Sequence, residues 1–147
     1  MHMRFGILLI AAAFLTAPAH AYDFQPAKPM DIKDVDPASL NDMYGAWVIS
    51  DKSGKKRCRI TLLKEPSIGG NQIEVAPGCD KAFPVMADIS AWRLLEGWGV
   101  DLIDPLRKIR VRFTTPDDRY VPFGDAKDIA GMYELLKVTV RPAQGKK

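Results

Sequence analysis

The stretch KIRVRFTT at residues 108–115 is the clearest β-strand in the sequence and sets its fold class. Apolar and basic residues alternate along it, and this two-residue period is typical of a strand with one buried and one solvated face. We expect an apolar set to point inward and a basic row to point outward. The inward set is Ile109, Val111 and Phe113, and the outward set is Lys108, Arg110 and Arg112.

Seven further stretches from residue 44 onward have the character of short strands separated by turn residues. Residues 57–63 alternate most cleanly, with Cys58, Ile60 and Leu62 on one face. The others are 44–50, 72–76, 89–95, 98–104, 119–123 and 131–140, the last with an ambiguous period. A helical turn is expected within 80–86. Eight short strands at close spacing predict an all-β fold, either an antiparallel barrel or a sandwich.

The N-terminus has the features of a secretory signal peptide. Arg4 precedes an apolar run at 5–15, and the triplet Ala19-His20-Ala21 follows it. A basic start, an apolar centre and a small-x-small end are the three parts of such a signal. The run is too short to anchor the chain in a membrane. No cysteine lies near the cleavage site, so we expect no lipid attachment there. We therefore expect Sec-type export and cleavage of residues 1–21, with a buried N-terminal helix as the alternative.

Cleavage would leave few groups capable of catalysis. It removes both histidines, His2 and His20, and one of the 21 basic residues, Arg4, which leaves 20 against 18 acidic residues. Histidine-based catalysis and histidine metal sites are then excluded. No serine lies in a G-x-S-x-G elbow, and Gly69-Gly70 lacks the lysine of a phosphate loop. We expect no enzyme activity, no cofactor, no metal and no nucleic-acid partner.

Two cysteines, Cys58 and Cys79, remain after cleavage. In an oxidising compartment an even pair predicts a disulfide, and two free buried thiols are the alternative. Closing a loop of about 22 residues would stabilise the fold by roughly 3 kcal/mol.

Three tryptophans, Trp47, Trp92 and Trp98, have two interpretations. They would either line a ligand cup inside a barrel or fill the core of a small one, and the second is the commoner arrangement. We expect all three in the core, with Trp47 the most central. The basic residues at 52–59 and 108–112 are interpreted as solvated strand faces rather than as a contact for an anionic surface.

Residues 22–42 differ in character from the rest of the chain. Pro26, Pro29 and Pro37 interrupt them, and neither a helical nor a strand period is sustained. We expect an extended N-terminal arm that ends in a short turn at 37–40. At the other terminus, residues 141–147 are expected to form a frayed polar tail.

Several residues occur in an order that is found in one known family. They are Gly45, Ala46, Trp47, Gly54, Cys58, Ala76, Pro77, Gly78, Cys79, Trp92 and Gly97. With this combination, residues 43–133 resemble the bacterial alkaline proteinase inhibitor family, called Inh. A branch of outer-membrane lipoproteins shares the same domain.

The resemblance implies an eight-stranded antiparallel up-and-down barrel over 43–140, with a disulfide between Cys58 and Cys79. It also implies periplasmic residence and tight inhibition of a secreted, serralysin-like zinc metalloprotease, and we expect a monomer. In the family, the arm ahead of the first strand enters the protease cleft and blocks the zinc. Protease contact is therefore assigned to Tyr22, Asp23, Phe24, Gln25 and Pro26.

One feature departs from the family pattern. About 25 residues lie between the cleavage site and Trp47, more than in the known protease inhibitors. An envelope carrier of small molecules or lipids is the main alternative function, and a structural envelope protein is another. Bulky inward residues such as Leu102, Val111 and Phe113 favour a packed interior and so disfavour a carrier.

Overall fold

The eight predicted strands are present and form one antiparallel sheet. The computed structural model describes residues 27–139, so predictions that fall on 1–26 or 140–147 lie outside the described residues. The strands are β1 (Gly45–Ser50), β2 (Arg57–Ser67), β3 (Gly70–Val75), β4 (Ala91–Leu94), β5 (Val100–Ile103), β6 (Ile109–Thr114), β7 (Val121–Phe123) and β8 (Glu134–Lys137). Their order across the sheet is β7-β6-β5-β4-β3-β2-β1-β8. The all-β, up-and-down prediction is confirmed.

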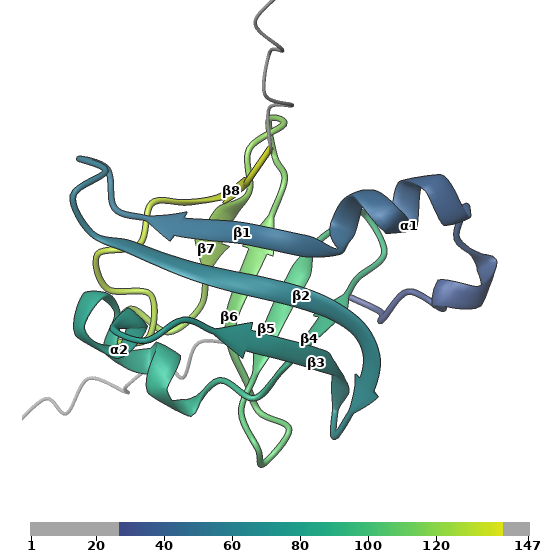
Figure 1. The fold of residues 1–147 in the computed structure, drawn as a ribbon, viewed down its shortest axis with the longest axis horizontal. Helices are drawn as coiled ribbons and strands as arrows, with labels where there is room; N and C mark the ends of the chain where they lie inside the picture. Colours follow the sequence, from purple (N-terminus) through teal and green to yellow (C-terminus); the bar gives the residue numbers. More distant parts are fainter. Residues whose placement is uncertain (1–26, 140–147) are drawn as a thin grey trace, which may run out of the picture.

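Short helices lie at two places in the chain. They are the 3₁₀-helix η1 (Ile32–Asp34) and α1 (Pro37–Met43) ahead of β1, and α2 (Cys79–Ala82) and the 3₁₀-helix η2 (Pro84–Asp88) between β3 and β4. The last two fall where the sequence predicted a helical turn. Figure 1 shows α1 and α2 on opposite sides of the molecule, near opposite ends of β1 and β2.

The sheet curls until its two edge strands meet. β1 pairs with both β2 and β8, whereas β7 pairs with β6. Within the described residues, β7 and β8 are joined through one isolated bridge between Tyr120 and Leu135, where the amide of Leu135 donates to the carbonyl of Tyr120 at 3.0 Å. In the described part of the chain, the curled sheet therefore closes through this bridge rather than along a full strand pair.

The concave face of the sheet is filled with apolar side chains. Alternate residues of β1, β2, β4, β5 and β6 are buried there, and β3 adds the half-buried Ile73 and Val75, as the predicted alternation requires. This set includes Ile49, Ile60, Leu62, Trp92, Val100, Leu102, Val111, Phe113 and Leu135. The filled interior agrees with core packing and leaves the carrier alternative without support.

The disulfide prediction is confirmed. Cys58 of β2 is bonded to Cys79, the first residue of α2, and their Cα atoms are 4.7 Å apart. No free cysteine occurs among residues 27–139. The bond ties the connection after β3 to the sheet, and both sulfur-bearing residues are buried.

The predicted outward row on β6 is wrong at Arg112. Lys108 is exposed and Arg110 half-buried, but Arg112 is only 4% exposed. Its guanidinium donates from Nε to Oδ1 of Asp101 at 2.6 Å and from Nη2 to Oδ2 at 2.9 Å. Asp101 is the cross-strand neighbour of Arg112 on β5 and is fully buried. A bidentate pairing of this kind compensates much of the cost of burying two charges.

Candidate functional site at the N-terminal segment

The N-terminal segment is attached to the sheet before it reaches α1. The amide of Met30 donates to the carbonyl of Leu94 at 2.9 Å, and the amide of Glu96 donates to the carbonyl of Lys28 at 2.9 Å. Between them, Pro29 forms an isolated antiparallel bridge with Leu95. Both bonds use the neighbours of Pro29, so its missing N–H leaves no gap in the pairing. Residues 28–30 thus pair alongside residues 94–96, at the end of β4, as a short added strand.

Helix α1 follows from a local sequence signal. Asp36 is the N-cap, and its Oδ2 accepts from the amide and the hydroxyl of Ser39 at 3.0 and 3.1 Å. The bond from the Ser39 amide lowers the pKa of Asp36. Pro37 occupies the first helical position, where it needs no N–H. The prediction of an extended arm over 22–42 is therefore wrong from Ile32 onward, and the turn expected at 37–40 begins a helix.

Three side chains from the sheet hold the C-terminal end of α1. The indole Nε1 of Trp47 donates to the carbonyl of Met43 at 2.8 Å. The Tyr120 hydroxyl lies 3.5 Å from Sδ of Met43, and Nζ of Lys137 donates to the carbonyl of Tyr44. Trp47 lies in β1, Tyr120 directly precedes β7 and Lys137 lies in β8. The three side chains therefore come together only in the folded sheet. We call this group the anchor: Met43, Tyr44, Trp47, Tyr120 and Lys137.

Burial sets the electrostatics of the anchor. It lowers the pKa of the Lys137 amine, and the charge of nearby Asp42 acts in the opposite direction. The amine lies 5.0 Å from the Trp47 ring centre, close enough for a cation–π contact. Burial also raises the pKa of Tyr120, whose ring packs edge-on against Trp47 at 5.4 Å. These contacts hold the C-terminal end of α1 against the sheet.

The three tryptophans do not share one environment. Trp47 and Trp92 lie in the core, and Trp92, at 0% exposed, is the more deeply buried, so Trp47 is not the most central. The prediction for Trp98 is wrong because this residue is 36% exposed. It lies in the turn between β4 and β5 with φ of 65°, and β5 begins two residues later, at Val100.

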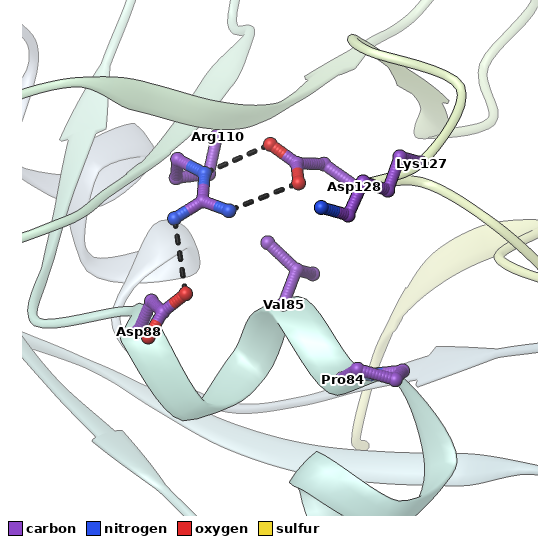
Figure 2. Close-up of a pocket in the computed structure, with 6 residues that line it drawn as sticks. All are labelled: Pro84, Val85, Asp88, Arg110, Lys127 and Asp128. Carbon is purple, nitrogen blue, oxygen red and sulfur yellow. Dashed lines mark hydrogen bonds and ion pairs between the residues drawn. The ribbon is translucent and has the colours of Figure 1, made fainter.

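Figure 2 shows a second polar cluster, in which Arg110 of β6 bonds to Asp88 of η2 and to Asp128 of the loop after β7. Arg110 donates from Nε and Nη2 to the two carboxylate oxygens of Asp128 at 2.8 and 2.9 Å, and from Nη1 to Asp88 at 3.1 Å. The bond from Arg110 lowers the pKa of Asp128, and the bond to Asp128 raises that of Arg110. The cluster borders an open hollow of about 280 Å³ that is also lined by Pro84, Val85 and Lys127. It connects η2 and β6 to the loop after β7.

No group of three or more histidine, cysteine, aspartate or glutamate side chains in the described part of the chain could hold a metal ion. Among the helices of residues 27–139, none has the length and hydrophobicity that a membrane span requires.

A comparison with known families identifies the family of this chain. The sequence model of the family described as protease inhibitor Inh matches residues 37–127, more than half of the chain. This chain belongs to the Inh family. Neither the curated proteins nor the solved structures gave a match. The matched range of the Inh domain begins at Pro37, the first residue of α1, and ends beyond β7.

Membership of the Inh family makes the protein a protease inhibitor, and so it has a protease as partner and is not an enzyme. The match includes most of the anchor, but Lys137 and the paired residues 28–30 lie outside it. Sequence reasoning missed these two contacts because each joins segments far apart in the chain. The predicted protease-contacting residues, Tyr22, Asp23, Phe24, Gln25 and Pro26, lie outside the described residues.

Proposed function

We propose that the protein inhibits secreted zinc metalloproteases of the serralysin type by inserting its N-terminal arm, Tyr22–Pro26, into the active-site cleft. Export to the periplasm and removal of residues 1–21 would make Tyr22 the first residue. A disulfide between Cys58 and Cys79 is in keeping with an oxidising compartment.

The observation that carries the proposal is the double attachment of the chain just behind the arm. Residues 28–30 pair with the end of β4, and the anchor holds α1. An arm that starts from a fixed base loses less conformational freedom on docking than one that starts from a mobile linker. The barrel itself offers a packed interior, so the arm is the part of the molecule best suited to enter a cleft.

The chemistry of inhibition needs no reactive group on this chain. An extended segment can pair its backbone groups with the edge of a protease cleft, as a substrate does. A polar group near the start of the arm then takes the place of the zinc-bound water. Since that water is the nucleophile of zinc-dependent hydrolysis, its displacement stops turnover.

The test compares two chains against a purified serralysin-type protease. One begins at Tyr22 and the other at Ala27, which retains the pairing of residues 28–30 and all of α1. We expect the inhibition constant of the shorter chain to be at least about 100-fold higher, because this chain lacks every residue assigned to the cleft. A matched control removes five residues, 143–147, from the other terminus and should inhibit as the full chain does.

Three results would decide against the proposal. Equal inhibition by the chains that begin at Tyr22 and Ala27 would assign inhibition to the barrel. Absence of inhibition by the longer chain at micromolar concentration would exclude this class of protease as the target. A fall in the thermal midpoint of the shorter chain would show that residues 22–26 act on stability instead.

A further inference from the structure

The turn between β4 and β5 lies directly beside the base of the arm. The bridge between Pro29 and Leu95 is antiparallel and Lys28 accepts from the amide of Glu96, so Ala27, the first described residue, lies on the side of Gly97 and Trp98. Figure 1 shows the start of the described chain at the side of the molecule where β4 ends and α1 lies. Whatever binds the residues ahead of Ala27 therefore approaches this turn.

The length of the arm limits how far away that partner can be. Five residues, 22–26, span at most about 17 Å when fully extended. A protease domain is wider than this reach, and its cleft has walls on both sides of the bound segment. With the arm in the cleft, one wall of the protease must therefore face the β4–β5 turn.

Trp98 is the residue that this turn presents. Its side chain is 36% exposed, and within residues 27–139 its indole N–H has no acceptor. Trp47 and Trp92, in contrast, are buried and donate to the carbonyls of Met43 and Leu63. An exposed tryptophan with a free N–H can bury a large apolar surface in a partner and still make a directed hydrogen bond.

The turn holds Trp98 in a fixed and unfavourable backbone conformation. A φ of 65° is rare for a bulky residue, and such conformations persist where the surrounding structure enforces them. Here the amide of Trp98 donates to the carbonyl of Leu95 at 3.0 Å, and that of Leu95 donates to the carbonyl of Gly99 at 2.8 Å. The hydroxyl of Thr115 adds a bond to Gly97 from the β6–β7 connection. Because the backbone of this turn is already fixed, presenting Trp98 to a partner costs little backbone freedom.

We infer that Trp98 is a second contact with the target protease, packing against an apolar patch on the rim of the active-site cleft beside the entering arm. This inference rests on the proposed function. Tryptophan is the residue most enriched among those that dominate binding energy at interfaces. The arm would block the active site, and Trp98 would lengthen the lifetime of the complex.

The experiment measures inhibition of a serralysin-type zinc protease by the mature chain and by variants at Trp98. Trp98→Asn and Trp98→Gly both tolerate a positive φ, so neither strains the turn. Each should raise the inhibition constant by about 30-fold or more, mainly through faster dissociation. Trp98→Phe keeps most of the apolar surface and should retain most of the affinity. The control is Leu106→Ala, at an 87% exposed residue of the β5–β6 turn, at the opposite end of β5 from Trp98.

The outcomes separate this inference from the function on which it rests. Strong inhibition by the mature chain, with weakening at Trp98 but not at Leu106 and unchanged thermal midpoints, would support the second contact. Strong inhibition with Trp98→Asn and Trp98→Gly within threefold of the mature chain would overturn the second contact and leave the arm mechanism intact. If the mature chain does not inhibit, both are overturned together.

Discussion

The two sides of the sheet are held by different kinds of interaction. At the disulfide side, the connections around α2 and η2 are fixed by the Cys58–Cys79 bond and by the pairing of Arg110 with Asp88 and Asp128. At the anchor side, the segment ahead of β1 is fixed by hydrogen bonds to main-chain carbonyls and by pairing with the end of β4.

This difference separates stability from recognition. The disulfide joins two side chains covalently and restricts the unfolded chain, whereas the ion pairs add stability in the folded state only. Bonds to the carbonyls of Met43 and Tyr44 instead fix the path of the backbone, and with it the direction in which the N-terminal segment leaves the barrel. We expect changes at the disulfide side to alter the free energy of unfolding, and changes at the anchor side to alter the order of α1 as well.

The largest effect on stability should come from removing the disulfide. Replacing both Cys58 and Cys79 by alanine should lower the free energy of unfolding by about 3 kcal/mol, because the unfolded chain is no longer cross-linked. Urea denaturation of the two proteins measures this difference. The inhibition constant of the folded fraction should not change. A loss of inhibition with unchanged stability would contradict the separation of the two sides.

An intermediate effect is expected at the anchor. Trp47→Phe keeps an aromatic ring but removes the donor to the Met43 carbonyl, and the free energy of unfolding should fall by about 1–2 kcal/mol. Hydrogen exchange should report faster exchange in α1. Trp92→Phe is the matched control, since it loses the bond to Leu63 and should leave α1 protected. Equal loss of protection in both variants would show that α1 responds to core stability alone.

The smallest effect concerns how the free energy of unfolding falls at acidic pH, through an ion pair at the disulfide side. The pKa of Asp128 is lowered by Arg110, so the pair stabilises the fold above the ordinary pKa of 3.8, and this contribution is lost as the pH falls through the lowered pKa. Asp128→Asn should remove that pH dependence and cost up to about 1 kcal/mol at neutral pH. Chemical denaturation at several pH values measures both. Asp117→Asn, at the exposed pair with Arg119, should change neither.

The strands could be predicted because alternation reports which residues share a face. Cys58, Ile60 and Leu62 on β2, and Val111 and Phe113 on β6, are buried as expected. The same rule placed Arg112 on the opposite face, but it carries no information on whether that face is shielded. The burial of Arg112 depends on its pairing with Asp101 from the neighbouring strand.

The missed features depend on contacts between distant segments. The turn around Gly97 displaces Trp98 from β5, and a shift of this kind decides whether a side chain points into the core. Helix α1 has seven residues, too few to be stable alone, and it is held by Trp47, Tyr120 and Lys137. The Asp36-Pro37 pair was its only local signal.

The bridge that joins β7 to β8 within residues 27–139 has a consequence for contact between molecules. Strands β7 and β8 contain three and four residues, so the two edges that meet at this seam are short. The carbonyl of Tyr120 points toward β8. Pro122 lies two residues further along the strand and so presents its backbone to the same side, but it has no N–H to donate. A neighbouring chain that approached β7 would find almost no template for an added strand, which protects this incompletely closed sheet from edge-to-edge aggregation.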